Sequence, residues 1–139
     1  MSRLRIIGPI FLTDTINSER YRKNVLEPFV AQLSEREIEH AWFQQDGATA
    51  HTAVKSLEFL DGIFANRVIS RGIWPARSPD LTPLDYYLWG ELKGNVYENN
   101  PHTIDELQVS IINNINNITQ PVLHKVFDNM KKNVSILAN

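Results

Sequence analysis

The sequence contains no cysteine, and this absence limits its chemistry before any motif is considered. Without a thiol, the chain can form no disulfide scaffold, no thiolate zinc site and no cysteine nucleophile. It also lacks a hydrophobic run close to the roughly 18 residues of a membrane span, and its first residues show no apolar core of a secretory signal. We therefore expect a chain without a membrane segment.

Neither sign of charge dominates the composition. There are 14 Lys+Arg and 16 Asp+Glu, which gives a formal net charge of −2. A hydrophobic fraction of 42% and a charged fraction of 22% are close to globular averages and exclude a wholly disordered chain. The length of 139 residues suits a single domain. The small net charge leaves nucleic-acid binding open, because basic side chains can gather on one face.

The distribution of apolar residues predicts alternating strands and helices. Short β-branched runs predict three strands, at 5–12, 41–44 and 67–70. Apolar residues at helical spacing predict five helices, over about 18–34, over 52–63, over 82–96, from Thr103 and from Thr119. The residues at 35–40 are highly charged and predict a connector.

This order of elements predicts an α/β fold, with a short mixed sheet, helices on its faces and additional C-terminal helices. We expect the sheet to lie within residues 1–100 and a helical extension, packed on it, to occupy residues 101–139. Three short strands are few for five helices. The pattern therefore indicates a sheet whose opening strands are missing.

Two carboxylates are candidates for chemistry, since the sequence has no glycine-rich phosphate loop. Asp46 follows a predicted strand and precedes Gly47, and Asp85 lies in the first turn of a predicted helix. The carboxyl ends of strands and the helix starts beyond them share one edge of an α/β sheet, where two acids could hold divalent cations. An alternative stays open for each acid, because Asp-Gly is a common turn and an acid in a first turn favours the helix dipole.

Two longer motifs contain these acids. Residues 42–52 read WFQQDGATAHT, and residues 74–89 read WPARSPDLTPLDYYLW. The first resembles the second catalytic block of mariner-type DDE/D transposases, and the second resembles the third block. The resemblance runs from about Gly8 to the C-terminus, and the separation of the two acids is somewhat longer than in the commonest members.

The resemblance implies a partial ribonuclease H-like fold for residues 1–100. It implies that Asp46 and Asp85 are catalytic acids that bind Mg²⁺ or Mn²⁺, with no small-molecule cofactor. Asp80 belongs to the same motif and is interpreted as a turn-forming residue. DNA as the partner, a homodimer and a nuclear location are further implications of the family.

The start of the sequence departs from the family pattern. In the family the first catalytic Asp lies on an opening strand, well upstream of the segment that matches residues 7–11. Here only six residues precede Ile7, and none is acidic. Helix-turn-helix domains that grip transposon ends do not occur in these 139 residues either. We therefore expect a transposase fragment that is inactive alone in DNA cleavage and strand transfer; the alternative is a non-enzymatic, domesticated or relic domain that keeps nucleic-acid or protein contacts.

Basic and aromatic residues near the predicted catalytic edge suggest a DNA-binding surface. Residues 62–79 contain Arg67, Arg71 and Arg77 and no acid, and Trp74 lies among them. Arginines contact phosphates, and a tryptophan can stack on an unpaired base. The alternative, that Trp74 packs beneath a proline-rich loop while the arginines are solvated, stays open.

His51 is an auxiliary candidate at the entry to the second predicted helix. It matches a position of the family motif and lies five residues after Asp46. The imidazole could orient a metal ligand or contact a phosphate. Alternatively, it caps the start of the helix or packs against the strand.

Overall fold

The computed structural model describes residues 1–70, 82–98 and 100–137. The chain divides into two compact units. We call Ile10–Arg77 the sheet unit, and Met1–Pro9 together with Ser78–Asn139 the helical unit. No helix within the described residues is both long enough and apolar enough to cross a bilayer.

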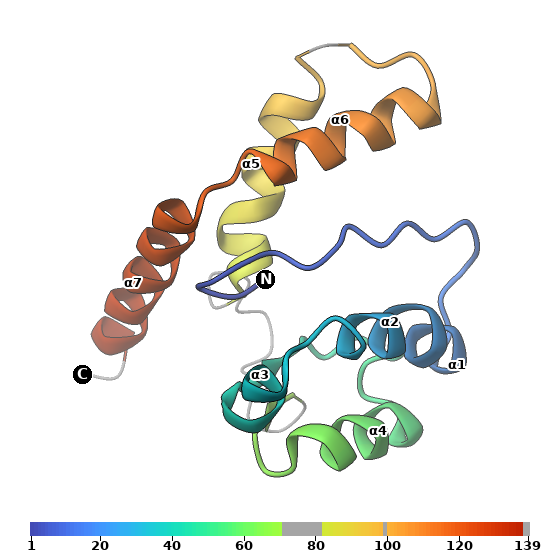
Figure 1. Cartoon of the computed structure of the whole chain (residues 1–139), viewed down its shortest axis with the longest axis vertical. Helices are drawn as coiled ribbons and strands as arrows, with labels where there is room; N and C mark the ends of the chain where they lie inside the picture. Colours follow the sequence, from blue (N-terminus) through green and yellow to red (C-terminus); the bar gives the residue numbers. More distant parts are fainter. Residues whose placement is uncertain (71–81, 99, 138–139) are drawn as a thin grey trace. The chain divides into compact units, whose positions relative to one another are not determined.

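A nearly continuous helical segment opens the sheet unit (Figure 1). It consists of α1 (Ser18–Tyr21), a π-helical turn η1 (Arg22–Leu26) and α2 (Glu27–Val30). The segment begins where Asn17 caps it, because the Asn17 side-chain oxygen accepts a hydrogen bond from the Arg20 N–H at 2.9 Å. The helix predicted over 18–34 is confirmed, although it ends a few residues earlier.

A short helix, α3 (Glu35–His40), occupies the stretch for which a connector was predicted. It begins with a capping box. The Ser34 hydroxyl accepts a hydrogen bond from the Glu37 N–H at 3.3 Å, and the Glu37 carboxylate accepts one from the Ser34 N–H at 2.9 Å. The connector prediction was wrong. The segment is highly charged, but the Ser-x-x-Glu pattern at its start is a local signal for a helix.

Two short parallel strands form the sheet. They are β1 (Phe43–Gln44) and β2 (Val68–Ile69), and α4 (Val54–Phe64) connects them. Phe43 lies opposite Val68 in the register of the pair. The strands predicted at 41–44 and 67–70 are confirmed in shortened form.

Residues 5–12 form no strand, so the third strand prediction was wrong. An apolar, β-branched run gains strand structure only when another backbone pairs with it. Within the described part of the chain, the sheet contains only β1 and β2. The described residues are thus mixed α/β and mostly helical, while the ribonuclease H-like fold stays a prediction.

The core of the sheet unit lies between the opening helical segment and α4 (Figure 1), and Phe43 and Val68 of the strands pack against it. Tyr21, Leu26, Leu60 and Phe64 are its buried members. From the sheet, Phe43 stacks on Phe64 with their ring centroids 5.4 Å apart. This packing fixes β1 against α4, and so fixes the start of the loop that follows β1.

The helical unit contains the remaining helices, namely η3 (Leu84–Leu88), α5 (Trp89–Val96), α6 (Ile104–Asn116) and α7 (Gln120–Leu137). They confirm the helices predicted from residues 82, 103 and 119. Leu88, Leu92, Val96 and Ile115 form the buried cluster between η3, α5 and α6. The functional division of the chain at residue 100 stays a prediction.

Candidate functional site

Asp46 lies just beyond the carboxyl end of β1, as the sequence predicted. β1 ends at Gln44, and the next N–H, that of Gln45, still donates to the Ile69 carbonyl of β2 at 3.0 Å. The chain leaves the sheet only after this bond. Asp46 therefore starts the loop at the carboxyl edge of a parallel pair, the edge at which α/β folds usually bind ligands.

His51 folds back onto Asp46 from the other end of that loop. Its Nδ1 lies 2.6 Å from Asp46 Oδ1, and the same oxygen accepts a hydrogen bond from the Ala48 N–H at 3.0 Å. Since an ionised carboxylate can only accept, Nδ1 carries the proton. The side chain of Asp46 remains 52% exposed, against 28% for His51. The side chains of His51 and Asp46 are thus in contact, and the role of His51 at a metal ligand stays a prediction.

The pKa of the Asp46 carboxyl is lowered. Partial burial is the largest single influence and acts to raise it, but the Ala48 hydrogen bond, the His51 hydrogen bond and the attraction to His51 together outweigh it. Asp46 is consequently ionised at neutral pH. That is the form in which a carboxylate binds a hard divalent cation.

A buried polar network beneath the loop was not predicted. Gln45 accepts a hydrogen bond from the Tyr21 hydroxyl at 2.9 Å, and its amide donates to the His51 carbonyl at 2.9 Å and to Ser70 Oγ at 3.1 Å. Tyr21 and Ser70 lie 24 and 25 positions from Gln45 in the sequence. No local sequence pattern links residues so far apart. The one sequence feature that pointed to Gln45 was its place directly before Asp46 in the motif.

The second candidate acid, Asp85, lies in the helical unit. It is exposed in the first turn of η3, as predicted. Because Asp46 belongs to the sheet unit, a shared site of the two carboxylates stays a prediction. Asp80, interpreted as a turn-forming residue, lies outside the described residues.

Of the predicted DNA-binding residues, the structure describes only Arg67. Its guanidinium donates to the carbonyls of Ala41 and Ile38, at 3.0 and 2.9 Å. Arg67 directly precedes β2 and so lies at the amino end of the parallel strands, whereas Asp46 follows their carboxyl end. A structural role is therefore evident, and contact of Arg67 with a phosphate stays a prediction. Arg71, Trp74 and Arg77 lie outside the described residues.

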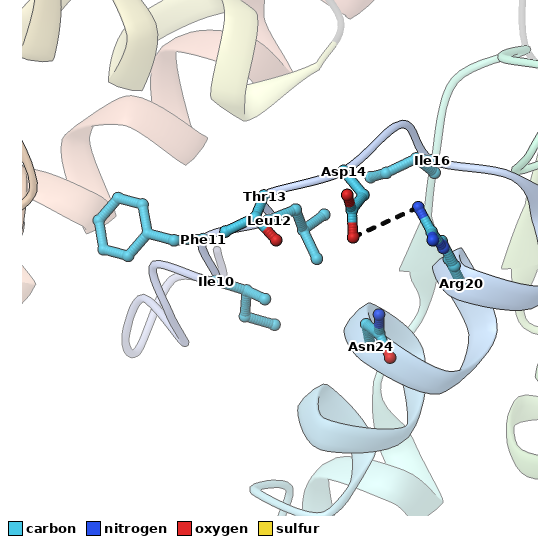
Figure 2. Close-up of a pocket in the computed structure, with 8 residues that line it drawn as sticks. All are labelled: Ile10, Phe11, Leu12, Thr13, Asp14, Ile16, Arg20 and Asn24. Atoms are coloured by element: carbon cyan, nitrogen blue, oxygen red, sulfur yellow. Dashed lines mark ion pairs between the residues drawn. The ribbon is translucent and has the colours of Figure 1, made fainter. Parts of the chain in front are cut away.

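A pocket of about 200 Å³ opens elsewhere in the sheet unit (Figure 2). It lies between the extended residues 10–16 and the opening helical segment, and Asp14 faces Arg20 across it at 3.6 Å. The Arg20 guanidinium also donates to the Thr15 carbonyl at 3.0 Å. None of the predicted site residues lines this pocket, so it is separate from the Asp46 loop.

The donor set at Asp46 suits a divalent cation in part. Within the described residues, the hydrogen bonds that the carboxylate accepts go to Oδ1, so Oδ2 is the oxygen that a cation could contact. Among the described residues, however, no three His, Asp or Glu side chains cluster closely enough to hold an ion by themselves. Metal binding by Asp46 therefore stays a prediction.

Comparison with known proteins finds similarity to transposases of transposable elements. The chain is 36% identical to the Tc3 transposase of Caenorhabditis elegans over 94 residues, which cover 65% of this chain and 26% of that protein. It is 25% identical to the Tc1 transposase of the same organism over 127 residues, which cover 91% of this chain and 45% of that protein. No family model matches the sequence. The chain therefore spans less than half the length of these relatives, and the similarity supports a relationship to transposable-element transposases.

Proposed function

We propose that the chain is part of the catalytic domain of a mariner-type DDE/D transposase with a ribonuclease H-like sheet. The observation that carries the proposal is the position of the Asp46 carboxylate, held by His51 and Ala48 at the carboxyl edge of two parallel strands. It lies within residues 42–52, the segment that resembles the second catalytic block. The similarity to the Tc1 and Tc3 transposases supports the same assignment.

In this proposal Asp46 and Asp85 bind divalent cations, Mg²⁺ or Mn²⁺. Such ions, when bound, activate water or a DNA 3′-hydroxyl for attack on a phosphodiester. Asp46 contributes Oδ2, while the His51 ring keeps Oδ1 occupied and limits rotation of the carboxylate. A DNA partner, a homodimer and a nuclear location belong to the proposal as well.

We further propose that these 139 residues do not cleave DNA by themselves. They carry two of the three carboxylates of the family pattern, and Mg²⁺ requires nearly ideal octahedral coordination. Neighbouring acids are poor substitutes, because a displacement of about 1 Å can reduce a rate by roughly 100-fold. DNA affinity without cleavage is the expected behaviour.

The test combines a metal probe with a cleavage assay. Mn²⁺ should broaden the amide NMR signals around Asp46 and Asp85, and the broadening should disappear at the corresponding residue in Asp46→Asn and Asp85→Asn. Asp61→Asn, which neutralises an exposed acid on α4, serves as the matched control and should keep both effects. Supercoiled plasmid incubated with the chain and Mg²⁺ should remain uncut.

Three results would contradict parts of this proposal. Broadening that is unchanged in Asp46→Asn would remove Asp46 from the metal site. Metal-dependent nicking that is lost in Asp46→Asn would show that the chain is active without a third acid. DNA binding with no Mn²⁺ effect at either residue would favour the non-enzymatic alternative.

A further inference from the structure

The buried amide of Gln45 is the link between the sheet and the Asp46 loop. Gln45 is only 6% exposed, and its side chain has partners on three different segments. These are the Tyr21 hydroxyl of α1, the His51 carbonyl at the far end of the loop and Ser70 Oγ just after β2. A single amide therefore ties both ends of the loop to the helix and the sheet.

The orientation of this amide follows from its partners. A backbone carbonyl can only accept, so the group that faces the His51 carbonyl must be the NH₂. Oε1 then faces Tyr21, whose hydroxyl must donate. Burial raises the pKa of that hydroxyl, and the negative charge of Asp46 adds to the effect, so Tyr21 keeps its proton at neutral pH.

Tyr21 also contacts His51 directly. The two ring centroids lie 4.4 Å apart with the planes tilted by 36°. His51 is thus held twice, through its carbonyl by Gln45 and through its ring by Tyr21. Its Nδ1 also bonds to Asp46 at 2.6 Å, and its backbone N–H donates to the Ala48 carbonyl at 3.0 Å. The series of contacts runs without interruption from the core to the carboxylate.

We propose that Gln45 and Tyr21 are positioning residues for Asp46. By holding the backbone and the ring of His51, they hold its Nδ1 against Oδ1 and so limit the rotation of the Asp46 carboxylate, so that Oδ2 is presented to a metal ion. This role deepens the proposed function and rests on it for the metal, but the geometry of His51 and Asp46 can be tested without one. A group bonded directly to a ligand, as His51 is to Asp46, typically changes metal affinity by about 10- to 100-fold when mutated, and groups that act through it should have effects at or below the lower end of this range.

The experiment compares Gln45→Met and Tyr21→Phe with the wild-type full chain. Gln45→Met keeps the length of the side chain and removes all three hydrogen bonds, whereas Tyr21→Phe removes only the hydroxyl and leaves the ring on His51. The first readout is the ¹⁵N NMR spectrum of the His51 ring, which distinguishes a proton on Nδ1 from one on Nε2. The second is the dissociation constant for Mn²⁺ alone.

We expect wild-type His51 to carry its proton on Nδ1. Gln45→Met should shift protons to Nε2 and weaken Mn²⁺ binding by roughly 10-fold, with a smaller change in Tyr21→Phe. Tyr97→Phe, an exposed tyrosine outside the network, is the matched control and should change neither readout. If Gln45→Met does not fold, Tyr21→Phe decides the matter by the same two measurements.

The outcomes separate this role from simple structural support and from failure of the proposed function. Variants that melt at a lower temperature but keep the wild-type His51 spectrum and Mn²⁺ affinity would overturn the positioning role. A His51 spectrum that responds to the variants in a chain that binds no Mn²⁺ would refute the metal site alone. The ordering of His51 and Asp46 by Gln45 and Tyr21 would then still be established.

Discussion

The sheet unit and the helical unit differ most in what they bury. The described residues that are buried and polar, Gln45, Ser56 and Ser70, all belong to the sheet unit. The helical unit buries an apolar cluster built on Leu88, Leu92, Val96 and Ile115. One unit thus combines a small core with a polar network, while the other depends on helices that pack through their apolar faces.

This difference indicates that the positions of side chains are determined most strictly in the polar network of the sheet unit. Apolar packing tolerates changes that conserve volume, whereas each donor in a buried network requires its own acceptor. Ser56, for example, donates to the Ala50 carbonyl at 2.8 Å and so holds the end of the Asp46 loop against α4. Specific hydrogen bonds are therefore concentrated around the loop to which we assign the metal ligand.

The largest expected effect tests whether the two cores are separate. Leu60→Ala should lower the free energy of unfolding by about 2–5 kcal/mol, because Leu60 is 0% exposed in the core of the sheet unit. Hydrogen exchange should show the loss in α4 and in residues 18–30 while the amides of α6 keep their protection. Leu92→Ala, in the core of the helical unit, should produce the reverse pattern.

Loss of protection throughout the chain in both variants would contradict this comparison. It would mean that the two cores unfold as one cooperative structure. The denaturant dependence of unfolding provides an independent check, since two separable units should not give one transition in every spectroscopic signal.

The next effect concerns Arg67, whose guanidinium holds two carbonyls at the amino end of the sheet. Arg67→Ala should destabilise the sheet unit by about 1.5–3 kcal/mol, in the range for hydrogen bonds to charged groups. Arg3→Ala is the matched control in the helical unit, because its 3.0 Å ion pair with Asp128 is solvent-exposed. Such pairs contribute about 1 kcal/mol or less.

DNA binding separates the two roles of Arg67. If the DNA surface depends on Arg71 and Arg77, their double replacement by alanine should reduce the salt dependence of binding by up to about 0.9 per lost phosphate contact. Arg67→Ala should lower stability in either case, and its salt slope decides whether Arg67 also contacts a phosphate, as the sequence predicts. An unchanged slope would leave Arg67 with its structural role alone. A slope that falls in Arg67→Ala to the same extent would show that Arg67 contacts a phosphate.

A smaller effect compares one helix start in each unit. Ser34→Ala removes the capping box of α3, and Thr103→Ala removes the 3.1 Å bond from the Glu106 N–H at the start of α6. Each should cost about 0.5–2 kcal/mol. Because α3 has 6 residues and α6 has 13, hydrogen exchange should show loss of the whole of α3 but only of the first turn of α6. Equal losses in the two helices would contradict this expectation.

The sequence predicted those parts of the fold that depend on local signals. Helical periodicity and caps identified the opening helical segment, α4 and the helices of the helical unit. The strand prediction for residues 5–12 failed because strand structure depends on a partner backbone, which no property of the run itself reveals. α3 was missed although its signal, Ser34 with Glu37, is local and readable.

The residues of the candidate site show the same difference between local signals and long-range contacts. Asp46 and His51 could be found because they lie in one short motif, and their spacing allows a hydrogen bond across one loop. Tyr21 and Ser70 could not be found from the sequence, since their contacts with Gln45 exist only after the helix and both strands have packed. The hydrogen-bond network of Tyr21, Gln45 and Ser70 behind Asp46 is thus a property of the tertiary structure rather than of the motif.

The smallest expected effect is a pH dependence that arises in the sheet unit through Asp46. A carboxyl whose pKa is lower in the folded state stabilises the fold above its unfolded pKa of about 3.9, and this contribution is lost as the pH falls through the folded value. Asp46→Asn should therefore reduce the free energy of unfolding slightly at pH 7, and the difference from wild type should shrink below about pH 4. The effect is small because the side chain is 52% exposed and solvent screens its interactions. Denaturant unfolding of both proteins at pH 7 and at about pH 3 measures the difference, with Asp61→Asn as the control for a change of net charge alone. A difference that grows as the pH falls would mean that the Ala48 and His51 bonds do not favour the ionised form of Asp46.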